Sequence, residues 1–472
     1  MIMKNKTISN IIKVSISNIF SLLTSILVGF LLPKILNISD YGYYKTFTLY
    51  VTYVGLLHFG IISGIYLKYG GTDYKELPLE KFRLYTKFIF FIELALSVLF
   101  FLLSFILLND EIRIVFYFVA CFVFLTNVST YYQTISQITL RFRELSNRTF
   151  ILSVLQIFLI LICYILFHFG VKIDYLMYIF LYTLINLFIV LWYFITYKDI
   201  FFGKSSKFKD GKNEIINFLK SGFPLMIANL CSTLIMTLDR QFVNVLFDNN
   251  TYAIYAFAYN LLSMITTITS AISMVIFPSL KKIKEEDVKH MYSRLISIIS
   301  IVGLFFINSF YPLHIFINWF LPQYSSSLNI FKIILPGIAI SSCITIVMHN
   351  FYKVLNINNL FFIKSLIALF VSLVANIVAY FIFGTTIAIS IASVLCIAIW
   401  YIISNLKIVK ITNEKSVKNI IYLFGMCIVF YALSLLNNEF LSAIIYFIIY
   451  CIITIIFYRK DINSAFKITK NK

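Results

Sequence analysis

Polar side chains recur every three or four residues along four long apolar segments of this 472-residue chain. Such spacing places each set on one face of a helix. In chain order the four sets are Ser17, Asn18, Ser21, Thr24 and Ser25; Lys45, Thr48, Thr52 and Gly55; Asn229, Thr233, Met236 and Arg240; and Asn260, Ser263, Thr267 and Ser270. Polar groups on an apolar helix turn toward other helices or toward water. They either form ordinary hydrogen bonds between helices or line a shared hydrophilic cavity.

Charged side chains also lie within these apolar segments or at their ends, where a charge costs about 2.5–3.5 kcal/mol at a helix centre. Lys45 and Arg240 are candidates for contacting an anionic group, and Glu93 and Asp239 for exchanging a coupling proton. Structural alternatives stay open: Asp239 and Arg240 can form an interfacial pair, and Glu93 can pair with a nearby cation. The predicted substrate-binding residues are Lys45, Arg240, Thr48, Thr52, Asn18, Asn229, Asn260 and Ser263.

Motifs for catalysis are absent from the sequence. It contains no Walker A loop, GxSxG or HExxH motif, and no pair of glycine-rich phosphate turns. The seven cysteines lie in apolar segments without metal-type spacing. We therefore predict no catalytic residues, no metal site and no cofactor, so the protein is not expected to be an enzyme. Energy for any transport would come from an ion gradient, the substrate gradient or a partner.

The composition predicts the elements that hold these side chains. With 61% hydrophobic and 12% charged residues, the chain is far more apolar than a soluble domain. We predict an all-α, polytopic membrane protein with about fourteen transmembrane helices, each needing roughly 20 apolar residues. The segments fall near residues 13–33, 43–67, 86–108, 113–135, 149–168, 174–196, 218–239, 252–277, 293–316, 328–350, 360–383, 386–406, 418–436 and 440–458.

The distribution of basic residues predicts the orientation. If the N-terminus is cytoplasmic and the chain alternates, the outer half holds only six of the 39 Lys and Arg residues, namely Lys34, Lys45, Arg113, Lys172, Arg240 and Lys332. Cytoplasmic loops carry the excess of positive charge in membrane proteins. Both termini are therefore predicted to be cytoplasmic. The net charge of +19 fits anionic lipid headgroups, and no nucleic-acid partner is predicted.

An internal repeat suggests the domain organisation. Tyr41 and Tyr44, where the second segment begins, match Tyr252 and Tyr255, where the eighth begins, at a constant offset. Six segments separate the copies, so both copies face the same way, as in transporters that rock two halves around a central site. We predict a six-helix bundle over residues 1–200, a cytoplasmic linker over 201–217, a second six-helix bundle over 218–406, and two further helices with a basic tail over 407–472.

Several marks in the sequence resemble bacterial polysaccharide flippases of the Wzx type. They are residues 29–36 running into 40–44, Phe223-Pro224, Asp239-Arg240, Phe277-Pro278, and Asn376 followed by residues 384–388. These flippases belong to a superfamily with multidrug extruders of the MATE type and lipid II flippases. The stretch from Asn376 to residues 384–388 departs from the glycine-rich pattern of this family.

The resemblance implies a V-shaped pair of helical bundles around a central cavity. It implies a flippase of the bacterial inner membrane that moves undecaprenyl-pyrophosphate-linked oligosaccharide repeat units from the cytoplasmic to the outer leaflet, for O-antigen, lipopolysaccharide or capsule. Its partners would be this lipid-linked substrate, membrane lipids, and a polysaccharide polymerase and chain-length regulator.

Two alternatives follow from the same residues. A drug/cation antiporter of the same superfamily would need acidic cavity residues, for which Glu93 and Asp239 are the candidates. A membrane-embedded oligosaccharide polymerase would need a large outer loop, and no predicted loop is longer than about 25 residues.

Overall fold

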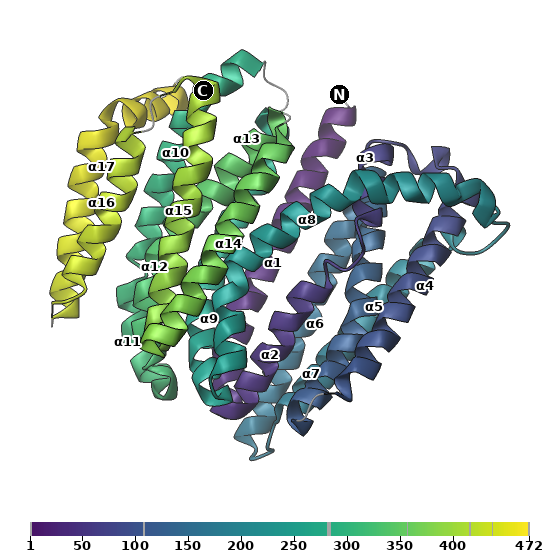
Figure 1. Ribbon diagram of the computed structural model, residues 1–472, viewed down its shortest axis with the longest axis horizontal. Coiled ribbons are helices and arrows are strands. Elements are labelled where there is room, and N and C mark those ends of the chain that lie inside the picture. Colours follow the sequence, from purple (N-terminus) through teal and green to yellow (C-terminus); the bar gives the residue numbers. More distant parts are fainter. Residues whose placement is uncertain are drawn as a thin grey trace. The chain divides into compact units, whose positions relative to one another are not determined.

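The computed structural model describes residues 2–106, 109–280, 285–355, 357–414, 417–436 and 438–470, and over these ranges the fold is all-helical (Figure 1). The chain divides into two compact units. Unit 1 comprises Met1–Leu230 and Asp248–Ala253, and unit 2 comprises Cys231–Phe247 and Ile254–Lys472.

Unit 1 is built from seven α-helices and the first part of an eighth. They are α1 (Ile2–Ile35), α2 (Ile38–Val54), α3 (Ile61–Tyr69), α4 (Leu79–Ser104), α5 (Asp110–Ile138), α6 (Phe142–His168), α7 (Tyr175–Thr196) and α8 (Phe208–Leu246), with short 3-10 turns η1 (Tyr74–Glu76) and η2 (Lys198–Ile200). Helix α5 is central, because it packs against α2, α3, α4, α6 and α7. The boundary between the units falls inside α8.

Unit 2 contains the end of α8, most of α9 and the remaining helices. These are α9 (Asn249–Leu280), α10 (Glu285–Ile307), α11 (Phe310–Phe320), α12 (Ser327–Ser342), α13 (His349–Val354), α14 (Asn358–Phe383), α15 (Thr386–Thr412), α16 (Val417–Leu433) and α17 (Glu439–Lys470). A 3-10 turn, η3 (Pro322–Tyr324), precedes α12, and a π-helical segment, η4 (Cys343–Met348), separates α12 from α13. Helix α12 packs against α10, α15 and α16.

The prediction of an all-α polytopic membrane protein is confirmed. Eleven helical segments in the described part of the chain are long and apolar enough to cross a membrane. Helices α2, α9 and α16 lie at the three remaining predicted positions. The predicted number of fourteen is therefore approximate.

Local residue chemistry sets the ends of several helices. Helix α7 begins after Asp174, whose carboxylate accepts a hydrogen bond from the Met177 N–H at 2.8 Å. Helices α14 and α15 are joined by only two residues. Gly384 adopts φ +61°, and the Thr385 hydroxyl accepts from the Ala388 N–H at 3.2 Å. A left-handed glycine followed by an N-cap threonine ends one helix and starts the next.

The predicted second and ninth segments differ from the structure. Residues 43–67 are two helices rather than one, because the backbone turns between Val54 and Ile61 with Phe59 at φ +49° and Gly60 at φ +82°. Residues 293–316 are likewise divided between α10 and α11. Apolar composition does not distinguish a straight span from one that breaks within the membrane.

Close backbone packing occurs next to the break after α2. A Cβ atom added at Gly60 would lie 2.4 Å from the Phe223 nitrogen, and one at Gly222 would lie 2.0 Å from the Gly60 carbonyl oxygen. A Cβ atom at Gly64 would meet the Phe218 backbone. Three glycines thus allow α3 and the first part of α8 to approach more closely than any side chain would permit.

The first part of α8 also carries polar and aromatic contacts to α3 and α4. The Glu214 carboxylate forms ion pairs with Lys68 and, at 3.0 Å, with Lys81. The Phe218 ring lies 5.1 Å from that of Tyr85 in an edge-to-face arrangement. Residues 208–217, which lie within the predicted linker, therefore form a helix packed on the rest of unit 1.

Candidate functional site

Asp239 is the centre of a buried polar cluster in unit 2. It lies on α8 with 2% of its surface exposed. Its carboxylate accepts hydrogen bonds from the Tyr255 hydroxyl at 2.7 Å and from the Tyr259 hydroxyl, both on α9. The same carboxylate accepts from the Arg240 backbone N–H at 2.8 Å. Three donors therefore stabilise this buried carboxylate.

Arg240 does not form a side-chain ion pair with Asp239. One of its Nη atoms donates to the Met236 carbonyl at 2.8 Å, and its guanidinium carbon lies 4.6 Å from the centroid of the Tyr259 ring. Its Nε is buried and has no hydrogen-bond partner among the described residues. The guanidinium is thus held by a carbonyl and an aromatic ring, and its contact with an anionic group stays a prediction.

Lys45 is half-buried on α2 in unit 1. Its Nζ lies 5.2 Å from the ring centroid of Tyr41 and 5.6 Å from that of Tyr44. Its backbone carbonyl accepts from the Tyr252 hydroxyl at 3.2 Å. Like Arg240, this predicted cation lies over tyrosine rings, whose negatively polarised faces attract a positive charge.

Glu93 is buried on α4 in unit 1, with 1% of its surface exposed. One carboxylate oxygen accepts from Asn127 Nδ2 on α5 at 2.8 Å. Asn127 also donates to the Val54 carbonyl at the end of α2, at 3.0 Å. No described Lys, Arg or His forms an ion pair with Glu93, so the alternative of a neighbouring cation finds no support in the described contacts.

The hydroxyl stripe of the first segment is partly used for helix packing. The Ser17 hydroxyl donates to the Ser146 carbonyl at 2.8 Å, and the Thr24 hydroxyl donates to the Ser153 carbonyl at 3.2 Å. Both bonds join α1 to α6. For these two residues, ordinary hydrogen bonding between helices is the correct interpretation.

The other predicted polar residues are more accessible. Asn18, Thr48 and Asn260 are half-buried, and Thr52, Asn229 and Ser263 are exposed. Hydroxyls of Thr48, Thr52 and Ser263 donate to carbonyls of their own helices. Within unit 1, Lys45, Thr48 and Thr52 follow one another along α2. The structure does not test whether these residues bind substrate, and their role stays a prediction.

Tyr255, Tyr259 and Asn127 are polar-site residues that were not singled out as such from the sequence. Tyr255 was noted only as part of the repeat, although its spacing of four from Tyr259 places both on one face of a helix. Asn127 is an amide in the middle of an apolar segment, which is a usable signal. Which carboxylate Asn127 hydrogen-bonds to depends on which helices pack together, and the sequence does not show this.

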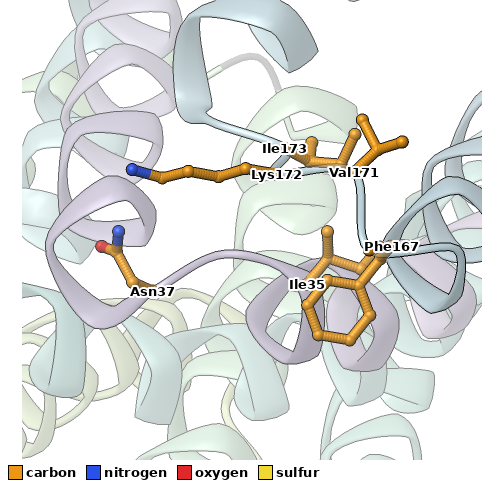
Figure 2. A pocket seen from close by; sticks show the side chains of 7 residues that line it. Ile35, Asn37, Phe167, Val171, Lys172 and Ile173 are labelled. Atoms are coloured by element: carbon orange, nitrogen blue, oxygen red, sulfur yellow. The ribbon is translucent and has the colours of Figure 1, made fainter.

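A separate pocket of about 280 Å³ lies where α1 and α6 end, within unit 1 (Figure 2). Figure 2 shows the polar ends of Asn37 and Lys172 on the same side of this pocket. The lining residues are Ile35, Asn37, Phe167, Gly170, Val171, Lys172 and Ile173. None of the predicted site residues is among them.

Metal-type clusters of three or more His, Cys, Asp or Glu side chains are not found in the part of the chain that the structure describes. The candidate site residues form one set in each unit. Unit 1 holds Glu93 with Asn127, and Lys45 over tyrosines; unit 2 holds Asp239 and Arg240 with Tyr255 and Tyr259.

A family model described as "Polysaccharide biosynthesis protein" matches residues 4–284, which is more than half of the chain. The chain belongs to this family. No match was found among curated protein sequences.

Solved structures show which fold this family member has. The lipid II flippase MurJ in an inward closed conformation matches with a TM-score of 0.68 and 14% identity, covering 96% of this chain and 100% of that one. An inward-facing multidrug resistance MATE family transporter of the MOP superfamily matches with a TM-score of 0.57 and 15% identity, covering 86% and 99%. A mutant of the Vibrio cholerae MATE transporter VcmN matches with a TM-score of 0.52 and 14% identity, covering 88% and 96%. The chain is a multi-pass membrane protein with the fold of this superfamily.

Proposed function

We propose that the protein is a flippase that moves undecaprenyl-pyrophosphate-linked oligosaccharide repeat units from the cytoplasmic to the outer leaflet of the bacterial inner membrane, by alternating access. The observation that carries the proposal is membership of the polysaccharide biosynthesis protein family by a chain with the fold of lipid flippases and exporters. The product would be a surface polymer such as O-antigen or capsule. A polymerase and a chain-length regulator would act on the units after translocation.

The physical problem in this reaction is the headgroup. A diphosphate linked to sugars cannot cross hydrocarbon unaided, because its charges would lose their hydration. A passage lined with hydroxyls, amides and cations would replace that hydration while the polyprenyl tail stays in lipid. The residues proposed for this contact are Lys45, Arg240, Thr48, Thr52, Asn18, Asn229, Asn260 and Ser263.

The surroundings of Arg240 support an anionic ligand. Asp239 is the adjacent carboxylate, yet it is engaged by two tyrosine hydroxyls rather than by the guanidinium. The Arg240 guanidinium lies over the Tyr259 ring, and its buried Nε has no acceptor among the described residues. A phosphate oxygen is the kind of acceptor that a guanidinium prefers.

Proton coupling is proposed for Glu93 and Asp239. Glu93 has a single hydrogen-bond donor and no cationic partner among the described residues, so it is the better candidate for gaining and losing a proton. Asp239, with three donors, is proposed to orient Tyr255 and Tyr259 as well. A cation antiporter remains the alternative function, because these same two carboxylates could bind a cation.

Genetic replacement tests the proposal. The gene is deleted in a host that makes a surface polysaccharide, and the leaflet in which lipid-linked repeat units accumulate is determined with a membrane-impermeant sugar-modifying reagent. Accumulation in the inner leaflet supports the flippase. Accumulation in the outer leaflet, with normal flipping, would instead indicate a polymerase and would overturn the proposal.

Complementation with variants then tests the two cations. The double variant Lys45→Ala/Arg240→Ala should restore flipping at least about tenfold less well than wild type, because charged hydrogen bonds contribute about 1.5–3 kcal/mol each. Arg113→Ala is the matched control, since Arg113 is an outer cation that pairs with Asp110 at 2.8 Å and is absent from the proposed set. Wild-type flipping by the double variant would remove Lys45 and Arg240 from the site.

A further inference from the structure

The contacts of Asn127 link Glu93 to the broken second segment. Asn127 is fully buried on α5, and its Nδ2 lies within hydrogen-bond distance of three oxygens. These are Glu93 Oε2 at 2.8 Å, the Val54 carbonyl at 3.0 Å and the Val123 carbonyl at 3.0 Å. An amide nitrogen has only two hydrogens, so the three acceptors compete for them.

The other end of the same amide is unsatisfied. Asn127 Oδ1 is buried and has no hydrogen-bond partner among the described residues. A buried acceptor without a donor is unfavourable, because it has lost its hydrogen bond to water. When Glu93 is protonated, it becomes a donor and can supply that missing hydrogen bond. The arrangement around Asn127 therefore has a different best hydrogen-bonding pattern for each protonation state of Glu93.

Val54 is the last residue of α2, and its carbonyl marks the start of the break. Its oxygen accepts from the Leu57 N–H at 3.1 Å as well as from Asn127. Phe59 then adopts a left-handed conformation, which is strained and uncommon for an aromatic residue. A backbone segment of this kind can take a second conformation when one of its holding bonds is removed.

We propose that Asn127 is a positioning residue that couples the protonation state of Glu93 to the angle between α2 and α3. The inference rests on the proposed function in taking Glu93 as the group that carries the coupling proton. With Glu93 ionised, the amide donates to the carboxylate and to the Val54 carbonyl, as in the structure. One proton from water converts the carboxylate to a carboxylic acid, whose O–H then donates to the amide oxygen. The amide turns to accept it, the bond to Val54 is lost, and the break between α2 and α3 relaxes.

Other polar groups near this contact have their own partners. On α5, the Tyr131 hydroxyl is hydrogen-bonded to Thr86 of α4 at 2.7 Å. In the turn after α2, His58 Nδ1 accepts from the Gly60 N–H at 3.1 Å. His58 is the other titratable group next to the break, so the experiment must distinguish it from Glu93.

The test measures the α2–α3 geometry directly. Spin labels are placed at Val51→Cys on α2 and Leu67→Cys on α3, in the full chain with its native cysteines replaced by serine. The protein is reconstituted in neutral phosphatidylcholine vesicles without lipid-linked sugar, and the distance distribution is recorded at about pH 5 and about pH 9, a range that brackets the titration of buried carboxyl groups. We expect the mean distance to differ by about 3 Å or more between the two values, as for a hinge movement.

Variants show which side chains cause the pH-dependent change in distance. Glu93→Gln should give the acid distance at both pH values, because its amide group imitates the neutral acid. Asn127→Leu should give one distance at both pH values, since Glu93 still titrates but is no longer connected to Val54. Ser97→Ala is the matched control: it removes a different α4–α5 hydrogen bond, from Ser97 to the Ala120 carbonyl at 2.7 Å, and should keep the full pH response. His58→Gln should keep it too.

A distance that does not depend on pH in the wild-type chain would overturn the inference. A response that persists in Glu93→Gln or in Asn127→Leu, or one that disappears in His58→Gln, would overturn it as well. These outcomes are independent of sugar transport, because no lipid-linked substrate is present. Failure of the flippase assay with an intact pH response would count against the proposed function alone.

Discussion

Among the described residues, each unit buries one carboxylate in an apolar helix, and the two are held in different ways. Glu93 in unit 1 has one side-chain donor, Asn127. Asp239 in unit 2 has three donors, two of them tyrosine hydroxyls. Charge burial is tolerated only when hydrogen bonds replace water. Asp239 is therefore held by three donors from its own helix and from α9, whereas Glu93 depends on one amide that is shared with a backbone carbonyl.

The largest effect is expected from removing the Asp239 carboxylate. Asp239→Leu leaves the Tyr255 and Tyr259 hydroxyls without their acceptor, and each buried unsatisfied group costs about 1–3 kcal/mol. The free energy of unfolding should fall by about 2–5 kcal/mol, measured by denaturation in detergent micelles. Glu93→Leu should cost less, because only one donor, Asn127, loses its partner.

A compensated variant checks the cause of this loss. Adding Tyr255→Phe and Tyr259→Phe to Asp239→Leu removes the orphaned hydroxyls together with their acceptor, and most of the lost stability should return. If the triple variant is no more stable than Asp239→Leu, the tyrosine hydroxyls are not the reason for the loss. An equal loss in Glu93→Leu would remove the distinction between the two carboxylates.

A second contrast concerns glycines in the two units. Gly222 of α8 packs against Gly60 and Gly64. A Cβ atom added at Gly222 would lie 2.0 Å from the Gly60 carbonyl oxygen and 2.6 Å from the Gly64 nitrogen. Gly425 of α16, in unit 2, has no atom within 4 Å of such a Cβ. Gly222→Ala should destabilise the protein by about 1–3 kcal/mol, because backbone atoms cannot move aside for the methyl group.

Gly425→Ala provides the control for helix propensity. Alanine is favoured over glycine in a helix by about 1 kcal/mol, so this variant should be neutral or slightly stabilising. Thermal unfolding in the same detergent compares the two. Similar melting temperatures for both variants would show that α8 does not need the close contact at Gly222.

These contrasts show what the sequence could predict. Helix ends with clear capping residues lie close to the predicted bounds: the start of α7, the end of α14 and the start of α15 agree within one residue, because Asp174, Gly384 and Thr385 act locally. The end of α15, at Thr412, lies beyond the predicted bound of 406. The break at Phe59 was not predicted, since it depends on the distant Gly222. A local pattern carries no information about a partner more than 150 residues away.

The candidate site follows the same rule. Asp239, Arg240 and Glu93 could be selected because a charge inside an apolar segment is conspicuous. Their partners could not, because Tyr259 and Asn127 lie on other helices and tyrosine is abundant in this chain, with 32 copies. Asp239 and Arg240 are adjacent in the sequence, but neighbouring residues on a helix point in different directions, and their side chains contact different groups.

The smallest effect is expected where the repeat-related helices α2 and α9 begin. Helix α2 is capped by Asn37, whose side-chain oxygen accepts from the Asp40 N–H at 2.7 Å. Helix α9 follows Asp248, whose carboxylate accepts from the Thr251 N–H at 3.0 Å and from the Thr251 hydroxyl. Asn37 and Asp248 occupy equivalent positions in the repeat, as do Asp40 and Thr251. One cap is neutral and the other is ionisable.

The two caps should therefore respond differently to pH. Hydrogen bonds from the Thr251 side chain and backbone lower the pKa of Asp248 below its ordinary value of 3.8. A lowered carboxyl pKa stabilises the fold above the unfolded-state value, and this contribution is lost as the pH falls through the folded-state value. Near Asn37, burial raises the pKa of Asp40. A raised carboxyl pKa has the opposite effect on stability: the fold is more stable while Asp40 is protonated and becomes less stable as the pH rises and Asp40 ionises.

Alanine at each cap measures the difference. Asn37→Ala and Asp248→Ala should each lower the free energy of unfolding by about 1 kcal/mol near neutral pH. At about pH 3 the effect of Asp248→Ala should shrink, because the wild-type carboxylate is then losing its charge, while the loss of the neutral Asn37 cap should persist. Asp248→Asn keeps a capping oxygen and should behave like Asn37, with no change between the two pH values. A loss in Asp248→Ala that is the same at both pH values would mean that this cap, too, acts without its charge.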